Sequence, residues 1–581
     1  MNIAALCAFL QPHGSGPSGR VSAFRTTLAT RHGLSALLET DQMTVLAEAS
    51  APHFVQPSSA LFWGHLFDRH SNRRLATVAD MRGAEAPACE FVASCWGGFL
   101  ALRVLDGVPE VLRDPSGGVP CYHAQIDGTH LFTTRPELLF DSGLLAAELD
   151  WTILAQAVAY RDQKPARTPL RGVSELLPGT VARLVRGQTE IETIWSPWRF
   201  TDAAHAIDGP AEAVELVRRA SENCISAWRG CFRRPLIELS GGLDSSIVAA
   251  LLGAPGDAIA ATFAAAEGDP DETHYASAVA SHLGLGLSVL KARIEDVDLT
   301  RSAAHDVPRP CARGFAQAMD AQLRTLAGVR GADAFFSGGG GDNVFCFLQS
   351  VLPVVDRLYR TGIGAGTFST IADMAELARV SVWEVAARSV KAAIPRRRPI
   401  WKFQENILSA EAGHALPLPR GHPWGDVPEG MLPGKIAHVR ALIGVQNHLE
   451  GHPRLRMAPI VSPLLSQPLV ETCLSVPSWL WCADGHNRAV ARAAFARYLP
   501  REVIERRSKG AFDGFCAQLV YRNRVLIREM LIDGELVRQR LVAAADVEAW
   551  LRDTRGTEIG KLLALTDVEA WIAAWQDRRP K

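Results

Sequence analysis

Short apolar stretches separated by glycine, proline and aspartate turns fill roughly the first 200 residues of the chain. Stretches of this kind at 99–105, 109–112, 120–123 and 129–132 are typical of strands joined by tight turns. A helical pattern covers residues 151–160. The spacing therefore predicts a β-rich N-terminal domain that is layered with a few helices.

The pattern changes around the stretch WSPWRFTDAAHAIDGP, residues 195–210. Beyond it helical periodicity dominates, and strands are predicted at 236–239, 258–264, 287–290 and 333–336. Strands that alternate with helices predict a parallel sheet covered by helices on both faces. We therefore expect two domains, residues 1–205 and 206–581, with an amphipathic helical tail at 546–581.

Composition narrows the class of protein. The 581 residues are 48% hydrophobic and 21% charged, which fits a folded protein with a substantial core. The net charge of −1 gives no reason to expect a nucleic-acid or anionic-membrane partner. Eleven cysteines without a C-x-x-C pair indicate reduced thiols in a cytoplasmic protein. Neither a transmembrane helix nor a signal peptide is predicted, because no apolar run reaches about 18 residues and no basic leader precedes the first apolar stretch.

The stretch LIELSGGLDSSIVAALL, residues 236–252, combines a predicted strand, a turn of small and polar residues, and a helix start. Small residues let backbone N–H groups approach an anion, and a helix N-terminus favours one. The turn lacks the lysine of a Walker A loop and the G-x-G-x-x-G pattern of dinucleotide-binding proteins. It matches instead the pyrophosphate loop of enzymes that split ATP into AMP and pyrophosphate. The alternative is a plain strand-to-helix turn with a serine cap.

The side chains of this turn fit a phosphate site. Serine hydroxyls can donate hydrogen bonds to phosphate oxygens, and glycines open the backbone. An aspartate facing phosphates alone would be repelled, so Asp244 is predicted to hold Mg²⁺, which prefers oxygen ligands. The predicted nucleotide-binding residues of the turn are Ser240, Gly241, Gly242, Asp244, Ser245 and Ser246.

A second block, FFSGGGGDNVF at residues 335–345, again places a glycine turn and an aspartate after a strand. With the first turn, it resembles the asparagine synthetase-like superfamily, which also contains β-lactam synthetase and the lasso peptide cyclases. The resemblance implies that Asp342 is a second Mg²⁺ ligand and that Gly338 contacts the nucleotide. Two carboxylates from two strand ends can hold one metal between phosphates.

Three further segments carry the resemblance. It implies that the backbone near Thr262, in IAATF, contacts adenine. It identifies Lys509, in LPREVIERRSKGAFDGF, as the catalytic lysine, which neutralises charge developing on the acyl-phosphate oxygens. Asp271 and Glu272, in DPDETHYASAVASHLGL, either cap a helix or lie near the metal.

The resemblance covers both halves of the chain and implies the fold class. The N-terminal half is expected to form an Ntn-hydrolase (glutaminase)-like β-rich sandwich, and the C-terminal half an adenine nucleotide α hydrolase-like parallel sheet with helices on both faces. Asparagine synthetases that use glutamine need an N-terminal cysteine, whose thiol attacks the amide. Here Asn2 follows Met1, and Cys7 lies inside an apolar stretch. We therefore expect the scaffold of the first domain to be retained without its nucleophile.

A second departure from the family is Gly339, three positions before Asp342. Asparagine synthetases carry a glutamate there and β-lactam synthetases a tyrosine. Glycine cannot transfer a proton and leaves space beside the acyl-adenylate. A peptide α-amine, with a pKa of about 7.7–8.0, needs less help from a base than a lysine amine near 10.4. The tetraglycine turn with GDNVF is similar to the lasso peptide cyclases, which close an Asp or Glu side chain onto the N-terminal amine of a peptide.

The preferred hypothesis is therefore ATP- and Mg²⁺-dependent macrolactam formation on a ribosomal precursor peptide. A leader peptidase and a leader-binding protein are candidate partners, whereas nucleic acid and membrane are not. Two alternatives stay open: an asparagine synthetase-like or β-lactam synthetase-like amide ligase that uses ammonia or a small amine, and a non-catalytic peptide-binding scaffold. The basic stretch 394–403 and the run Arg501, Arg506 and Arg507 favour a solvated face over a site for peptide carboxylates.

Overall fold

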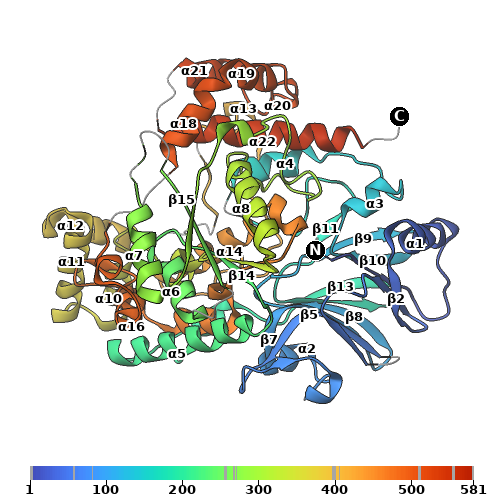
Figure 1. Cartoon of the computed structure of the whole chain (residues 1–581), viewed down its shortest axis with the longest axis horizontal. Helices are drawn as coiled ribbons and strands as arrows, with labels where there is room; N and C mark the ends of the chain where they lie inside the picture. The colour runs from blue at the N-terminus through green and yellow to red at the C-terminus, as the bar shows by residue number, and fades with distance from the viewer. Residues whose placement is uncertain are drawn as a thin grey trace.

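The computed structural model shows two antiparallel sheets in the N-terminal part of the chain and a parallel sheet surrounded by helices in the rest (Figure 1). It describes the chain except residues 1–3, 57–58, 82, 162, 254–257, 266–268, 270, 395–400, 405, 508–511, 553–555 and 579–581. The predicted division into a β-rich part and an α/β part is confirmed. The boundary between residues 205 and 206 stays a prediction.

The first antiparallel sheet has the strand order β11-β9-β10-β1-β3-β2. Its strands are β1 (Leu6–Leu10), β2 (Ser35–Glu39), β3 (Met43–Ala47), β9 (Tyr122–Ile126), β10 (Thr129–Thr133) and β11 (Ser174–Glu175). The second sheet has the order β13-β12-β8-β7-β5-β4, and β6 pairs with β5. Its strands are β4 (His53–Gln56), β5 (Ala60–Asp68), β6 (Arg74–Leu75), β7 (Cys95–Leu105), β8 (Val108–Arg113), β12 (Thr180–Val185) and β13 (Gln188–Thr193).

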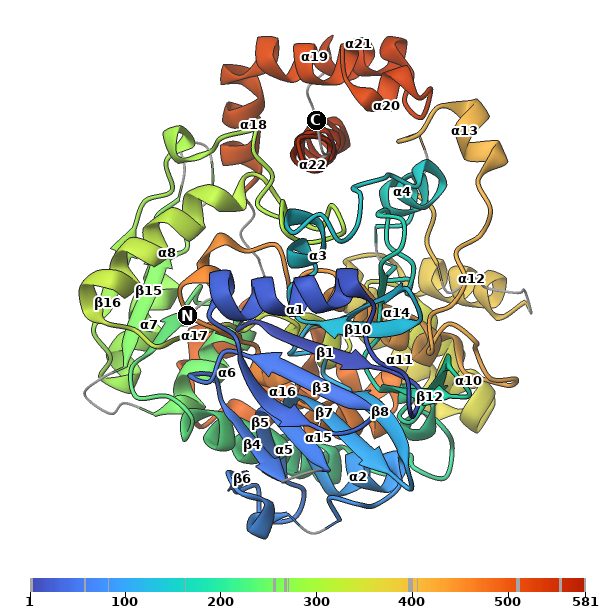
Figure 2. The same ribbon diagram turned by 90° about the vertical axis from the view of Figure 1, so that its right-hand side faces the viewer.

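The two sheets pack face to face as a sandwich. Side chains of β1 and β3 share one buried cluster with side chains of β5 and β7, which include Trp63 and Leu100. Helix α1 (Gly19–His32) lies over the outer face of the first sheet, and α2 (Ala88–Ser94) lies beside β7 of the second sheet (Figure 2). The strands predicted at 99–105, 109–112, 120–123 and 129–132 correspond to β7, β8, β9 and β10.

The parallel sheet of the second part has the order β16-β15-β14-β17-β18. Its strands are β14 (Pro235–Glu238), β15 (Ile259–Phe263), β16 (Leu287–Leu290), β17 (Ala334–Phe336) and β18 (Ile460–Val461). The first four of these strands were predicted from the sequence. Alternate residues of β14 point to opposite faces of the sheet, because Ile237 joins the core that contains α5 (Pro210–Arg229) and α6 (Leu243–Leu252), and Leu236 joins the one that contains α8 (Ala316–Arg330).

The remaining elements follow in chain order. They are α3 (Glu137–Asp141), α4 (Trp151–Ala159), α7 (Thr273–Leu283), α9 (Gly341–Val344), α10 (Leu352–Thr361), α11 (Ala365–Ala378), α12 (Val382–Ala393), α13 (Ala410–Ala415), α14 (Pro433–Gln446), α15 (Gln467–Ser475), β19 (Cys482–Ala483), β20 (His486–Asn487), α16 (Ala489–Phe495), α17 (Arg501–Ile504), α18 (Asp513–Arg522), α19 (Arg524–Ile532), α20 (Glu535–Arg538), α21 (Ala544–Arg552) and α22 (Thr557–Gln576). Helices α4, α21 and α22 confirm the helices predicted at 151–160 and in the tail.

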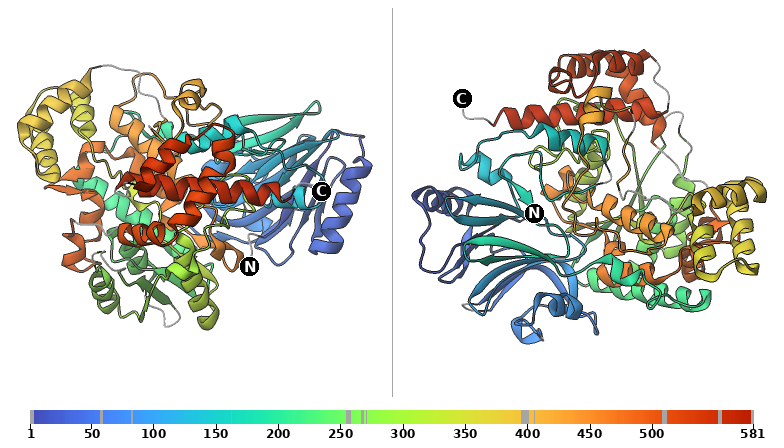
Figure 3. Two further views of the ribbon diagram at one scale, coloured as in Figure 1. Left: turned by 90° about the horizontal axis from the view of Figure 1, so that it is seen from above. Right: turned by 180° about the vertical axis from the view of Figure 1, so that it is seen from behind.

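The C-terminal helices connect the two parts of the chain. Helix α22 crosses from the helices around α18 towards α3 and α4, as the views from above and behind show (Figure 3). The rings of Trp575 in α22 and Phe140 in α3 pack edge to face with centroids 4.9 Å apart. Side chains of the first sheet and of α22 belong to one buried cluster. The tail therefore stabilises the contact between the two parts by burying apolar surface.

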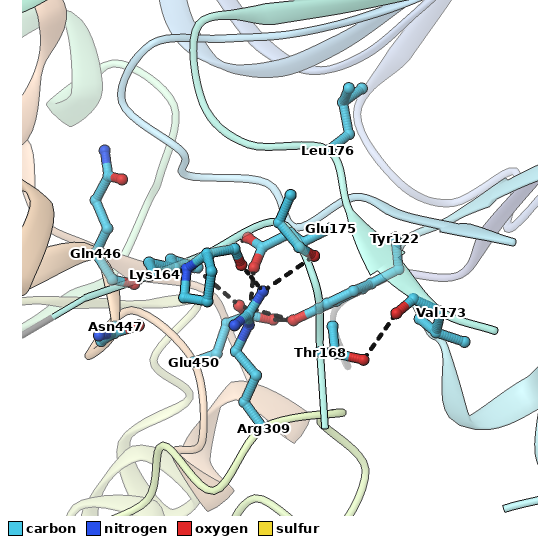
Figure 4. A network of polar contacts seen from close by, with 12 residues as sticks. Tyr122, Lys164, Thr168, Val173, Glu175, Leu176, Arg309, Gln446, Asn447 and Glu450 are labelled. Carbon is cyan, nitrogen blue, oxygen red and sulfur yellow. Dashed lines mark hydrogen bonds and ion pairs between the residues drawn. The ribbon is translucent and has the colours of Figure 1, made fainter. Parts of the chain in front are cut away.

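A buried polar network also joins the two parts (Figure 4). Glu175 of the first part binds Lys164 at 3.0 Å, Arg113 at 2.6 Å and, from the second part, Arg309 at 3.1 Å. Lys164 also lies 3.4 Å from Glu450 of the second part, whose carboxylate accepts a hydrogen bond of 2.8 Å from Tyr122. Burial opposes ionisation of Glu175, but the three cations outweigh it and lower its pKa to about 2.

Two sequence-based expectations concern the class of protein. All eleven cysteines are free thiols, as predicted. Within the described residues, no helix is long and apolar enough to span a bilayer. The cytoplasmic location stays a prediction.

Candidate active site

A cavity of about 540 Å³ opens at the carboxyl ends of β14, β15 and β17. Ligands of open α/β sheets bind at this edge, where loops from neighbouring strands meet. The cavity is lined by both glycine turns and by the loops that follow them. Of the predicted site residues, Ser240, Gly242, Asp244, Ser245, Thr262, Gly338 and Asp342 line it directly.

Hydrogen bonds between serines of the turn after β14 stabilise the conformation of that turn. The hydroxyls of Ser240 and Ser245 lie 2.9 Å apart, and the Ser245 hydroxyl accepts a hydrogen bond of 3.2 Å from the Ser240 amide. Gly242 caps α6, so the positive end of that helix points towards the cavity. Ser246 is fully buried, and its hydroxyl has no hydrogen-bond partner. The turn thus offers donors at a helix N-terminus, as a phosphate site requires.

Close packing explains the glycines on both sides of the cavity. A Cβ at Gly241, where φ is +70°, would lie 2.5 Å from the amide nitrogen of Ala276. A Cβ at Gly338 would lie 2.5 Å from the amide nitrogen of Ser245, and one at Gly341 would lie 2.4 Å from the carboxyl carbon of Asp244. The two glycine turns therefore touch backbone to backbone, which places their aspartates next to each other.

Asp244 and Asp342 converge on one point. The Nη1 nitrogen of Arg488 lies 3.1 Å from Oδ2 of Asp244 and 2.5 Å from Oδ1 of Asp342. Arg488 follows β20 with φ at +52°, and its guanidinium lies 5.2 Å from the ring centroid of Phe347. A positive charge between the two carboxylates is thus part of this arrangement.

The donor set at this point fits Mg²⁺ bound together with phosphates. Mg²⁺ usually takes one or two carboxylates and completes its shell with water and phosphate oxygens. Asp244 and Asp342 supply two carboxylates, and within the described residues no cluster of three or more acidic, histidine or cysteine side chains offers a complete cage. The residues that would hold the ion are therefore Asp244 and Asp342, with Ser240, Ser245 and the turn amides available for the phosphates. Ser246 is fully buried and does not line the cavity.

Residues of β15, α8 and the segment around Arg454 complete the lining of the cavity. Thr262 in β15 is buried, and Phe263 and Met319 also line the cavity. Arg454 binds Glu238 at 2.9 Å and pairs with Asp320, and among the described residues its buried Nε has no hydrogen-bond partner. The contact of Thr262 with adenine stays a prediction.

Lys509 lies outside the described residues, but the residues on either side of its segment line the cavity. Arg506 donates a hydrogen bond of 3.1 Å to the carbonyl oxygen of Gly241, stacks 4.1 Å from the ring centroid of Tyr275 and pairs with Glu272. On the other side, Phe512 also lines the cavity. Described residues close to Lys509 in the sequence, Arg506 and Phe512, therefore both lie at the cavity.

Asp271 and Glu272 have different surroundings. Asp271 is exposed, and its carboxylate accepts hydrogen bonds of 3.0 Å from the Thr273 amide and 2.7 Å from the Thr273 hydroxyl. These bonds lower its pKa and make it a cap for the start of α7. Glu272 instead lines the cavity and pairs with Arg506. Of the two open interpretations, capping holds for Asp271, and Glu272 lies in the site.

Cys7 is unsuited to nucleophilic catalysis. It lies in the middle of the first sheet with 1% of its surface exposed, and its thiol donates a hydrogen bond of 3.2 Å to Thr133. Burial raises the pKa of the Cys7 thiol to about 12, so the thiolate is scarce at neutral pH. Asn2 lies outside the described residues. The loss of glutaminase chemistry that we expect from the sequence is consistent with this burial.

Gly339 differs from its three glycine neighbours. Among the described residues, a Cβ there would meet two flexible hydroxyls, 3.3 Å away on Ser337 and 3.6 Å away on Ser462. Gly339 lines the cavity, so the missing side chain leaves room in it. That this room lies beside an acyl-adenylate stays a prediction.

Sequence reasoning missed Arg488, Arg454 and Arg492, which all line the cavity. Arg492 donates hydrogen bonds to the carbonyl oxygens of Asn487 at 2.8 Å and Arg506 at 2.9 Å, so it ties the chain before Arg488 to the segment before Lys509. Burial lowers its pKa to about 10, which leaves it protonated at neutral pH. Nothing in the stretch HNRAVARAAF distinguishes Arg488 and Arg492 from arginines of a solvated face.

The solvated face predicted for the basic run at 501–507 is wrong in part. Arg501 is exposed and pairs with Glu505 at 2.6 Å, as predicted. Arg507 is partly exposed and pairs with Glu376 at 3.0 Å. Arg506 is only 8% exposed, because it is sandwiched between Tyr275 and the turn at Gly241. In the other basic stretch, residues 395–400 lie outside the described residues.

A comparison with protein families agrees with this geometry. Residues 233–577 match the family model described as asparagine synthase, and the match includes every predicted residue of the nucleotide and metal site. No curated protein matches the chain.

Proposed function

Because the chain belongs to the asparagine synthase family, whose members are ATP-dependent carbon–nitrogen ligases that release AMP, we propose that it closes a peptide into a macrolactam. In this proposal, the enzyme activates an Asp or Glu side chain of a ribosomal precursor peptide and joins it to the N-terminal amine of the same peptide. The products are an isopeptide bond, AMP and pyrophosphate.

In the first step, a carboxylate oxygen of the peptide attacks the α-phosphorus of ATP, and pyrophosphate leaves. Ser240 and Ser245, which line the cavity, would hold the phosphates with their hydroxyls, together with the amides of the turn. Mg²⁺ held by Asp244 and Asp342 would neutralise charge on the phosphate oxygens. Arg488 and Arg506 add fixed positive charge on the same side of the cavity.

In the second step, the amine attacks the acyl carbon, AMP leaves, and the nitrogen loses its extra proton. A peptide α-amine with a pKa of about 7.7–8.0 is roughly one-tenth free at neutral pH, so the step does not need a strong base. Lys509 would stabilise the negative charge that develops on the acyl-phosphate oxygens. The larger contribution of the enzyme would be to position the two ends of the peptide.

The open space at Gly339 is the observation that supports a peptide as the substrate. The glutamate or tyrosine of other family members would fill this position beside the metal ligands, whereas here only two serine hydroxyls lie near it. Together with the buried thiol of Cys7, which is unsuited to releasing ammonia from glutamine, this space supports an amine that arrives on a bulky substrate. We infer further that a leader peptidase and a leader-binding protein deliver the peptide.

Product analysis tests the proposal. The protein is incubated with ATP, Mg²⁺ and a short candidate precursor peptide that has a free N-terminal amine and an Asp or Glu side chain, and in a parallel reaction with ATP, Mg²⁺, aspartate and ammonium. We expect AMP, pyrophosphate and a peptide lighter by one water in the first reaction only, with glutamine neither required nor hydrolysed. Amide formation only with ammonium would replace the proposal with a small-amine ligase, and ADP as the product would overturn both.

Matched variants link the activity to the metal site. Asp244→Asn and Asp342→Asn should each abolish pyrophosphate release while the protein stays folded, because each removes a carboxylate from the metal site. Asp271→Asn is the control, since this carboxylate caps α7 outside the cavity. Wild-type turnover by either of the first two variants would remove that residue from the metal site.

A further inference from the structure

The three-helix unit formed by α10, α11 and α12 exposes an unusual amount of apolar surface. Among the described residues, fifteen large apolar side chains are exposed, and seven of them lie between residues 359 and 394. These seven are Tyr359, Ile363, Phe368, Val382, Trp383, Val390 and Ile394. Apolar side chains gathered in this way on a folded protein indicate a binding surface.

On α12 the exposed apolar residues form a stripe. Trp383, Ala387 and Val390 lie along one side of α12, because four and three residues separate them. Ile394, which directly follows the helix in extended backbone, continues this spacing, and all four residues are exposed. Trp383 is 81% exposed and Val390 is 67% exposed. The opposite side of α12 carries Val385 and Ser389, which are buried against the other two helices. Alternating steps of three and four residues are the spacing of a helix that packs lengthwise against another helix.

The charged residues beside this stripe are arranged so that two antiparallel copies of α12 would place opposite charges next to each other. Glu384 and Lys391 lie seven residues apart and therefore on the same side of the stripe, one near each end. On the other side of the stripe, Ala386 and Ala393 occupy the corresponding positions, so a second helix can approach closely there. In the single chain, the ion pair that the described residues give Glu384 lies within its own helix, with Arg388 at 2.6 Å, and this pair is exposed.

We propose that the α12 stripe binds the same stripe of a second copy of the chain, with the two helices antiparallel about a twofold axis near residues 387–390. In this arrangement Trp383 packs against Ile394 of the other copy, and Ala387 packs against Val390. Flanking residues on the same side of the two stripes face each other in an antiparallel pair, so Glu384 of each copy meets Lys391 of the other. A twofold contact repeats every favourable pair, as a self-complementary surface requires.

The size of the surface sets the strength of the contact. Protein interfaces that bury less than roughly 1,200 Å² of surface are usually transient. Helix α12 has 12 residues, and two helices of this length bury less surface than that when they pack together. The dimer is therefore expected to form in the micromolar range and to dissociate on dilution. The proposal does not depend on the reaction catalysed, because α12 contributes no residue to the cavity.

Sedimentation velocity of the full chain across the micromolar range tests the dimer. The wild type should pass from monomer to dimer as concentration rises, and Val390→Asp should stay monomeric. Val329→Asp is the matched control, because Val329 is 79% exposed on α8, away from the stripe, and it should dimerise like the wild type. A wild type that is monomeric throughout, or a dimer that survives Val390→Asp, overturns the proposal.

A charge exchange tests the antiparallel register. Glu384→Lys alone and Lys391→Glu alone should each weaken the dimer about five- to thirtyfold, because two symmetric attractive pairs become repulsive. The double variant E384K/K391E should recover the wild-type dissociation constant. Failure of the double variant to recover overturns the register. The wild type could instead be monomeric while Val390→Asp loses binding of a peptide or of another protein. That result would overturn the proposed dimer and would show that the stripe binds a different molecule.

Discussion

The Nη1 nitrogen of Arg488 lies 2.5 Å from Oδ1 of Asp342. The same nitrogen is 3.1 Å from Oδ2 of Asp244, so one guanidinium is shared by the two carboxylates that are predicted to hold Mg²⁺. The three residues come from separate parts of the chain, and the close packing of the two glycine turns brings the carboxylates together. The guanidinium of Arg488 therefore contacts the same two carboxylates that are predicted to bind Mg²⁺.

Removing this guanidinium should make the protein more responsive to Mg²⁺. Arg488→Met takes away the cation that both partly buried carboxylates share, and we expect the free energy of unfolding to fall by about 1–3 kcal/mol. Mg²⁺ without ATP should then raise the melting temperature of this variant more than that of the wild type, because the ion replaces the lost charge. Thermal unfolding with and without Mg²⁺ measures both effects. Arg501→Met, which removes an exposed arginine, should respond to Mg²⁺ as the wild type does. An equal response of Arg488→Met and the wild type would show that no ion binds there.

The contact between the glycine turns can be tested at two adjacent positions. Gly338→Ala places a methyl group 2.5 Å from the Ser245 amide, so it should separate the turns, lower stability by about 1–3 kcal/mol and abolish pyrophosphate release. Gly339→Ala meets only the hydroxyls of Ser337 and Ser462 and should leave stability within about 0.5 kcal/mol of the wild type. Urea unfolding and pyrophosphate release are the measurements. Equal effects of the two variants would contradict the packing described above.

The network at Glu175 should make the stability of the interface between the two parts of the chain depend on pH. The pKa of Glu175 is lowered to about 2 in the folded chain and is about 4.3 in an unfolded one. A lowered carboxyl pKa stabilises the fold above the unfolded value, and this contribution is lost as pH falls from about 4.3 towards 2. Glu175→Gln leaves three buried cations without their shared partner and should cost about 3–5 kcal/mol at neutral pH. The difference from the wild type should shrink in acid, as measured by unfolding at several pH values.

The control for this prediction is Glu192→Gln. Glu192 pairs with Arg183 at the surface, and its side chain is 62% exposed. Its replacement should change stability little at any pH. A Glu175→Gln variant as stable as the Glu192→Gln variant would show that the network contributes nothing to this interface.

Lys509 should act on the chemistry rather than on binding. Lys509→Met removes one preorganised charge, which typically costs about 10²–10³ in rate, so ATP should still bind and little ring should form. Lys509→Arg should also fail substantially, since a planar guanidinium cannot take the place of a compact ammonium. Nucleotide binding and the yield of dehydrated peptide are measured in parallel. Full cyclisation by Lys509→Met would remove the lysine from the mechanism.

The parts of the site that sequence could predict are those encoded by contiguous residues. A strand, a glycine turn and a helix start follow one another at 235–252 and again at 334–344, and the structure has both units. The contacts of Arg488 could not be predicted in this way, because 244 residues separate it from Asp244 and only the fold brings them together. The burial of Arg506 depends likewise on stacking against Tyr275, a residue distant in the chain.

The fold shows the same division. The four longer strands of the parallel sheet have apolar patterns that identify them. Strand β18 has two residues, too few for any periodicity, and it is defined only by pairing with β17. The apolar stripe of α12 has a clear helical spacing, but its exposure depends on which side of the helix packs against α10 and α11.

In the proposed reaction, the nucleophile is the N-terminal amine of the activated peptide itself. Pyrophosphate release and peptide mass, followed together for the peptide and for its N-acetylated form, test this directly. The free peptide should release pyrophosphate and lose one water, whereas the acetylated peptide should still release pyrophosphate but not close. Loss of one water from the acetylated peptide would exclude the α-amine as the nucleophile, because the bond would then form without it.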